Sequence, residues 1–157
     1  MTPTEAAWMA GLIDGEGTIT VLKFQRKSGN CPHALYAPLL TVTNTDKRLI
    51  DRCIKLCGGY CVTVFCGRRN PNWKDAYHWR LKSAKLSGVL REVLPFLVSK
   101  ATQAALAIEV RDDMRVGSKP GRFGTTLTDK ERERRDEIWQ QLRILNTRGT
   151  KPRPAPV

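Results

Sequence analysis

The segment spanning residues 4–17 constrains the fold more than any other part of the sequence. It reads Thr-Glu-Ala-Ala-Trp-Met-Ala-Gly-Leu-Ile-Asp-Gly-Glu-Gly. Thr4, preceded by Pro3, has the features of a helix N-cap, and Glu5 suits the positive end of the helix dipole. Apolar residues fall on every face of this predicted helix, which is typical of a helix buried on more than one side. In a chain of 157 residues, a second copy of the chain is a candidate to cover the second face.

The end of this helix combines small residues with two carboxylates. Ala10, Gly11 and Gly15 are small enough to let two helix backbones approach closely, so we predict that they form a dimer interface. Asp14 and Glu16 fall at the negative end of the helix dipole, where anions are disfavoured, and such a conflict often marks a functional site. A divalent cation would remove the conflict, because carboxylate and carbonyl oxygens are ligands for Mg²⁺. The alternative is a solvated acidic turn.

The charge of the chain indicates a polyanionic partner. It has 27 Lys and Arg residues against 15 Asp and Glu, a net charge of +12 and a pI of about 9.9. Phosphate neutralisation releases condensed counterions, so such a surface favours nucleic acid. No basic amphipathic helix or apolar run of about 20 residues favours a membrane. The first residues lack the features of a secretory signal, and we expect an intracellular protein, in an organelle (chloroplast or mitochondrion) or a prokaryotic cytoplasm.

The pattern along the chain predicts an α+β fold, one antiparallel sheet with helices on one face. We expect strands at 18–24, 35–43, 60–65 and 76–81, and further helices at 47–56, 85–93, 100–115 and 129–145. Asn44 and Asp46 would cap the second helix, and the glycines at 58–59 would end it. The predicted organisation is a core at 1–115, a loop with a C-terminal helix at 116–149, and a disordered basic tail at 150–157.

The segment Met9–Gly17 resembles the nine-residue signature of the LAGLIDADG homing endonucleases. It departs only by Met for the first Leu, Gly for the second Ala, and Glu for the second Asp. The region 4–115 also resembles that family in its αββαββα order of elements. The resemblance implies a site-specific, intron-encoded DNA endonuclease that hydrolyses phosphodiester bonds with Mg²⁺, for which Mn²⁺ is a possible substitute.

The resemblance also implies roles for particular residues. Glu16 matches the metal-binding acid, and the carbonyl of Gly15 assists it. Lys100 and Arg48 match basic groups near the scissile phosphate, and Asn44 matches a polar group that orients solvent. For Lys100 and Arg48 the alternative is an ordinary solvated helix charge. We expect Asp14, by contrast, to support the turn.

One face of the predicted sheet is expected to lie on DNA, because strands alternate their side chains between two faces. In the fourth strand His78, Arg80 and Lys82 share a polar face that suits the major groove. The first strand is less regular, since Leu22 and Phe24 share the face of its threonines and Lys23 falls on the other. The full predicted DNA-binding set is Thr18, Thr20, Arg26, Thr41, Thr43, Arg68, Arg69, His78, Arg80 and Lys82. The alternative is solvated strand and loop charges.

The five cysteines favour free thiols over a metal site. They are Cys31, Cys53, Cys57, Cys61 and Cys66. An odd number without a signal peptide indicates reduced thiols. Cys53 and Cys57 lie four residues apart on a predicted helix and would be joined by His78 in a zinc site, but the paired CxxC knuckles of a structural zinc site are missing.

These observations predict an enzyme that acts as a homodimer. One chain carries one motif and one acid, whereas a double-strand break needs two, so we expect a homodimer that cuts a long pseudo-palindromic double-stranded DNA site. The alternative is an intron RNA maturase or a non-cleaving DNA-binding protein of the same fold. A basic structural protein, such as a ribosomal component, would explain the charge but not the buried helix with its acidic end.

Overall fold

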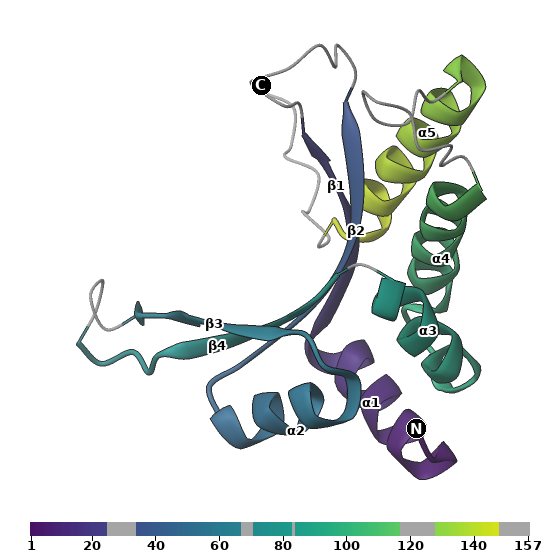
Figure 1. Cartoon of the computed structure of the whole chain (residues 1–157). Helices are drawn as coiled ribbons and strands as arrows, with labels where there is room; N and C mark the ends of the chain where they lie inside the picture. The colour runs from purple at the N-terminus through teal and green to yellow at the C-terminus, as the bar shows by residue number, and fades with distance from the viewer. Residues whose placement is uncertain (25–33, 67–70, 83, 117–127, 148–157) are drawn as a thin grey trace, which may run out of the picture.

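The computed structural model describes residues 1–24, 34–66, 71–82, 84–116 and 128–147. Its elements are α1 (Pro3–Glu16), β1 (Gly17–Phe24), β2 (Leu35–Asn44), α2 (Lys47–Cys57), β3 (Tyr60–Val64), β4 (Ala76–Leu81), α3 (Ala84–Val93), the 3-10 helix η2 (Leu94–Phe96), α4 (Ala101–Val116) and α5 (Asp129–Leu145). The strands form one antiparallel sheet in the order β1-β2-β4-β3. Figure 1 shows the sheet curving away from the helices, which cover one face and leave the other open. The predicted α+β architecture is confirmed.

Helix α1 begins earlier and ends later than its sequence suggests. Its N-cap is Thr2, not Thr4, because Pro3 occupies the first helical position and Glu5 completes a capping box with Thr2. The helix continues to Glu16, and β1 starts at the next residue, Gly17. A Cβ at Gly17 would lie 2.6 Å from the carbonyl oxygen of Ile13, so only glycine permits this direct passage from helix to strand.

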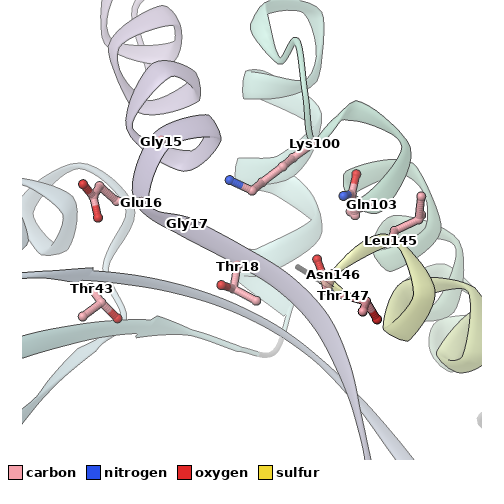
Figure 2. A pocket seen from close by; sticks show the side chains of 10 residues that line it. All are labelled: Gly15, Glu16, Gly17, Thr18, Thr43, Lys100, Gln103, Leu145, Asn146 and Thr147. Atoms are coloured by element: carbon pink, nitrogen blue, oxygen red, sulfur yellow. The ribbon is translucent and has the colours of Figure 1, made fainter. Parts of the chain in front are cut away.

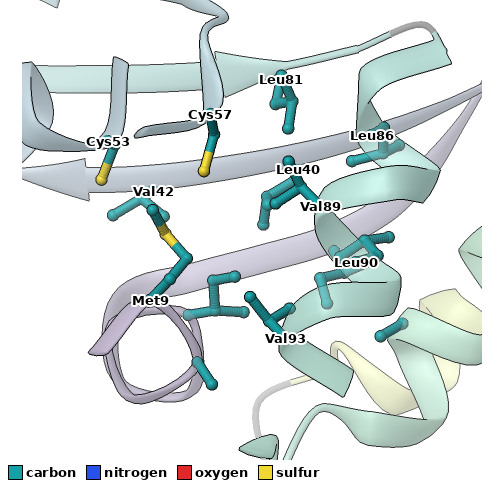
Figure 3. Close-up of a cluster of buried hydrophobic side chains, with 14 of the residues drawn as sticks. Met9, Leu40, Val42, Cys53, Cys57, Leu81, Leu86, Val89, Leu90 and Val93 are labelled. Carbon is teal, nitrogen blue, oxygen red and sulfur yellow. The ribbon is translucent and has the colours of Figure 1, made fainter. Parts of the chain in front are cut away.

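The main core lies between the sheet and helices α1 to α4. Leu40, Trp79 and Leu81 from the sheet are fully or almost fully buried and belong to one cluster with residues of α1, α2 and α3. Figure 3 shows Leu40 and Leu81 within this cluster. The Trp79 indole donates a hydrogen bond to the carbonyl of Gly58, which starts the turn after α2 at a φ of 73°. The glycines at 58–59 therefore end α2 as predicted.

The buried thiols belong to this core. Burial raises the pKa of Cys53 to about 12 and that of Cys57 to about 11, so both remain protonated thiols at neutral pH. His78 has its side chain on the open face of the sheet, and within the described residues no three His, Cys, Asp or Glu side chains gather. The zinc interpretation is therefore wrong for the described residues; Cys31 lies outside them.

The irregular pattern of β1 is explained by helix α5. Strand β1 pairs with β2 without interruption from Gly17 to Phe24, so no bulge changes its register. Lys23 turns to the helix face, where its ammonium pairs with Asp136 of α5 and lies 4.8 Å from the centroid of the Trp139 ring. Tyr36 of β2 also donates to Asp136, at 2.8 Å. A charged residue is thus accommodated on the core side of the strand.

Helix α5 contributes a second hydrophobic cluster. The buried members of this cluster are Val21, Tyr36, Val110, Ile138 and Leu142. The side chains of Ile138 and Leu142 have no exposed surface. The C-terminal helix therefore extends the core across β1 and α4.

Shortening Leu142 to alanine tests this contribution. We expect the free energy of unfolding to fall by about 3 kcal/mol, because a fully buried leucine loses both its transfer energy and its packing. Urea denaturation measures the change. Ile144, in the same helix but 74% exposed, is the matched control, and its replacement by alanine should cost no more than about 0.5 kcal/mol. Equal effects of the two substitutions would show that α5 does not pack as described.

Candidate functional site

A pocket opens where α1 passes into β1. Its volume is about 570 Å³, and its walls come from the end of α1, two strands, α4 and the end of α5 (Figure 2). The lining residues are Gly15, Glu16, Gly17, Thr18, Thr43, Lys100, Gln103, Leu145, Asn146 and Thr147. Five positions predicted from the sequence therefore meet at one place: Gly15, Glu16, Thr18, Thr43 and Lys100.

Asp14 joins α1 to the start of α4. Its carboxylate accepts hydrogen bonds from the backbone N–H groups of Val98 (2.7 Å), Ser99 (3.2 Å) and Lys100 (3.0 Å), and from the Ser99 hydroxyl (2.9 Å). Burial opposes ionisation of Asp14, but these hydrogen bonds outweigh it and lower its pKa. The carboxylate thus lies at the positive end of α4, which offsets its position at the negative end of α1. This agrees with a supporting role for Asp14.

Lys100 binds backbone carbonyl oxygens at the end of α1, on the other side of the same junction. Its ammonium donates to the carbonyl oxygens of Ile13 (2.8 Å) and Asp14 (2.5 Å) in the last turn of α1, and the Ile13 oxygen also accepts from the backbone N–H of Gly17. Burial lowers the pKa of Lys100, against the opposing attraction of Asp14 and Glu16. An ammonium group carries three donors, so one N–H remains for the pocket. Lys100 is therefore a positioned charge, not a freely solvated one.

Glu16 is the acid that the junction leaves available. It is exposed at the last position of α1, and among the described residues none donates a hydrogen bond to its carboxylate or pairs with it. A carboxylate is unfavourable at the negative end of the α1 dipole. For Asp14 the start of α4 offsets this, but for Glu16 nothing among the described residues does. In Figure 2 its carboxylate and the Lys100 ammonium flank the passage from α1 to β1.

Two residues assigned by resemblance lie outside the pocket lining. The Arg48 side chain is 90% exposed and pairs with Asp46 at the start of α2. The side-chain oxygen of Asn44 accepts a hydrogen bond from the backbone N–H of Asp46 at 2.8 Å. Both residues shape the N-terminus of α2, where Asp46 is the cap.

The wall formed by α4 and α5 has residues that the sequence did not reveal. Gln103 is 6% exposed and sits one turn after Lys100. Asn146 donates to the carbonyl oxygen of Ile19 at 2.9 Å, which ties the end of α5 to β1. Only the three-residue spacing of Lys100 and Gln103 on a predicted helix could have indicated that they share a face.

The open face of the sheet presents polar side chains in rows that run across the strands. One row contains Thr18, Thr41, Arg80 and Tyr60, each directly opposite the next; Thr43, His78 and Val62 form a second row.

Burial, and then the charge of Arg80, lowers the pKa of His78, so its imidazole is neutral at neutral pH. Lys82 lies 5.8 Å from the Tyr60 ring. Thr20 faces the same side one step further along β1; Arg26, Arg68 and Arg69 lie outside the described residues.

The outer face of α1 carries an open stripe of small residues. Ala7, Gly11 and Gly15 are exposed, and a Cβ placed on either glycine would meet nothing within 4 Å. Ala10 instead has no exposed surface and packs in the core of its own chain. Ala10 is therefore not exposed on this face of α1 with Gly11 and Gly15, whereas Ala7 is.

Replacing Asp14 by asparagine tests the junction between α1 and α4. We expect a loss of about 2 kcal/mol in the free energy of unfolding at neutral pH, because hydrogen bonds to a charged acceptor are lost. The pKa of Asp14 is lowered by folding, so its stabilisation is present above the ordinary value of 3.8 and is lost as the pH falls through the folded-state pKa. Urea denaturation should therefore show the wild type and the variant converging in acid. Ser99→Ala, which removes one donor only, should cost less; a pH-independent difference would contradict this role.

Comparison with known proteins identifies the fold. No family model matches the sequence, and no curated protein matches it either. The solved structure of the homing endonuclease I-CvuI in complex with its target has a TM-score of 0.70 at 19% identity, over 95% of this chain and 85% of that one. The archaeal intron-encoded homing endonuclease I-Vdi141I complexed with DNA has a TM-score of 0.72 at 17% identity, over 97% and 90%. The I-LtrWI LAGLIDADG homing endonuclease bound to target DNA has a TM-score of 0.62 at 17% identity, over 85% and 42%.

The described helices include none that is both long and apolar enough to cross a bilayer. The structural likeness to I-CvuI and I-Vdi141I covers 95% and 97% of this chain. The segment that resembles the family signature, Met9–Gly17, forms the α1–β1 junction at the pocket. This chain therefore has the fold of the LAGLIDADG homing endonucleases.

Proposed function

We propose that this protein is a site-specific DNA endonuclease that acts as a homodimer and hydrolyses phosphodiester bonds with a divalent metal ion. One observation carries the proposal: Glu16, an acid with no described partner, lies at the junction between a helix with an open small-residue stripe and a sheet with an open polar face. The net charge of +12 adds the attraction that a DNA partner requires.

The oxygen atoms at the pocket that could act as metal ligands suit Mg²⁺, with Mn²⁺ as a substitute. Glu16 and the backbone carbonyl of Gly15 would hold the ion. Among the described residues no cage of three protein ligands forms, which suits an ion that commonly keeps several waters and binds one or two carboxylates together with phosphate oxygens. When bound, such an ion lowers the pKa of a coordinated water and stabilises charge on the reacting phosphate.

The chain's own residues would position and neutralise the phosphate. Asp14 fixes the start of α4, which places Lys100 beside Glu16. The Lys100 ammonium, held by two carbonyl oxygens, is a preorganised positive group at the site where negative charge develops. The open face of the sheet would lie along the DNA, with threonine, histidine and arginine side chains directed at base edges and phosphates.

The homodimer follows from the open stripe on α1. Ala7, Gly11 and Gly15 would allow the same helix of a second copy to pack closely about a two-fold axis, which would bring two Glu16 side chains to one DNA duplex. The described residues contain one α1 and hence one Glu16, so a second copy would supply the acid for the second strand.

Selection of cleaved molecules from a randomised DNA library tests the proposal. We expect Mg²⁺ to support cleavage of a pseudo-palindromic site of roughly 20 base pairs, because a two-fold dimer imposes its symmetry on its target. Ca²⁺ should support binding to the same site without cleavage. Specific binding without cleavage under either ion, or stimulation of intron RNA splicing alone, would instead assign the chain to the non-cleaving or maturase class.

A further inference from the structure

The wall of the pocket contains a buried side-chain amide, that of Gln103, which forms no hydrogen bond with the described residues. Gln103 is 6% exposed, and its side-chain oxygen Oε1 is inaccessible to solvent and has no hydrogen-bond partner. Buried polar groups are nearly always paired, and an unpaired one lowers stability. A protein retains such a group where function requires it.

The neighbouring polar groups of the pocket already have partners. The Asn146 amide donates to Ile19, the Thr147 hydroxyl donates to the carbonyl of Arg143, and the Lys100 ammonium donates to two carbonyls. Gln103 is the exception among these four, since its amide makes no hydrogen bond with any described residue.

The orientation of the amide indicates a donor. Gln103 lines the pocket while its oxygen is buried, so the amide nitrogen is the end available to a ligand. Figure 2 shows this nitrogen on the side nearer Lys100 and Asn146. An amide N–H and an ammonium group that line the same pocket complement an anion with several acceptor oxygens.

We propose that the Gln103 amide donates a hydrogen bond to a non-bridging oxygen of the phosphate that is cut. This proposal rests on the endonuclease function proposed above and adds a phosphate-binding residue to Glu16 and Lys100. The position of Gln103 one helical turn after Lys100 lets the two donors meet the same phosphate from one helix. Because Gln103 is buried in α4 and two α1 carbonyls hold the Lys100 ammonium, the donors are fixed before DNA arrives, as transition-state stabilisation requires.

Gln103→Met is the direct test, because methionine keeps the length of the side chain and removes both polar atoms. We expect the cleavage rate at saturating DNA to fall by about 100-fold, as on removal of one preorganised donor, with the dissociation constant for the target in Ca²⁺ changed by less than about threefold. Gln103→Glu, which keeps an acceptor and adds negative charge, should cleave no faster than the methionine variant. The matched control is Gln141→Met, an exposed position on α5, which should leave both quantities unchanged.

Urea denaturation without DNA or metal separates this role from a structural one. The midpoint of Gln103→Met should equal or exceed that of the wild type, since a buried oxygen without a partner is removed. A lower midpoint, wild-type cleavage by Gln103→Met, or recovery of cleavage in Gln103→Glu would each overturn the proposal. If the wild type cuts no DNA, the proposed function fails first; if the wild type and Gln103→Met cut equally, only the role of Gln103 fails.

Discussion

Replacing Glu16 by glutamine should abolish cleavage while DNA binding survives. The variant keeps the size of the side chain and one acceptor oxygen but removes the charge that would hold a divalent cation. We expect the cleavage rate to fall by about 1,000-fold or more, because a bound metal provides several kcal/mol of transition-state stabilisation. The fold should be unaffected, since Glu16 is exposed and forms no hydrogen bond with the described residues.

The measurement pairs single-turnover cleavage with a binding assay on the selected target in Ca²⁺. Asp14→Asn provides a contrast, because it removes the neighbouring carboxylate and should mainly reduce stability. Glu5→Gln, at the other end of the same helix, is the control for the substitution itself. Cleavage by Glu16→Gln at more than about a tenth of the wild-type rate would exclude Glu16 as the metal-binding acid.

Replacing Gly11 by leucine should convert the proposed dimer to a monomer and eliminate double-strand cleavage. The new side chain would project from the open stripe on α1 and prevent a close approach of two helices. Within the monomer a Cβ at Gly11 meets nothing within 4 Å, so the substitution causes no clash there. Leucine is a better helix former than glycine by about 0.8 kcal/mol, and the free energy of unfolding of the monomer should not fall.

Analytical ultracentrifugation, with and without target DNA, measures the expected change. Gly88→Leu is the matched control, because Gly88 is also an exposed helical glycine, on α3, whose Cβ would meet nothing within 4 Å. That variant should remain dimeric and active. A Gly11→Leu protein that is still a dimer would place the interface elsewhere, and a wild type that cuts both strands as a monomer would overturn the homodimer.

The sequence predicted the fold well because its helices and strands depend on local signals. Alternating strands, caps and the glycines after α2 are encoded by neighbouring residues, and the observed order of elements follows them. Glu16 and Lys100 were both predicted, although they are distant in sequence, because the family resemblance relates their positions. Their meeting in one pocket supports that resemblance.

Several features that the sequence did not indicate depend on contacts between distant parts of the chain. Lys23 confused the strand pattern because its partner, Asp136, lies on α5 more than 100 residues away. Asn146 could not be assigned to the pocket, since nothing local indicates that the end of α5 returns to β1. Ala10 was placed in the interface by its size, whereas the direction of its side chain is set by the packing of α1 on the sheet.

The rows across the open face have a consequence for any attempt to change the DNA sequence that the protein would recognise. Side chains directly opposite one another on neighbouring strands are close enough to restrict each other's rotamers. A substitution at Thr41 therefore alters the space available to Thr18 on one side and Arg80 on the other. Variation along a single strand would sample mostly incompatible neighbours. A library that randomises one row at a time, leaving the others fixed, matches the way in which the sheet couples its residues.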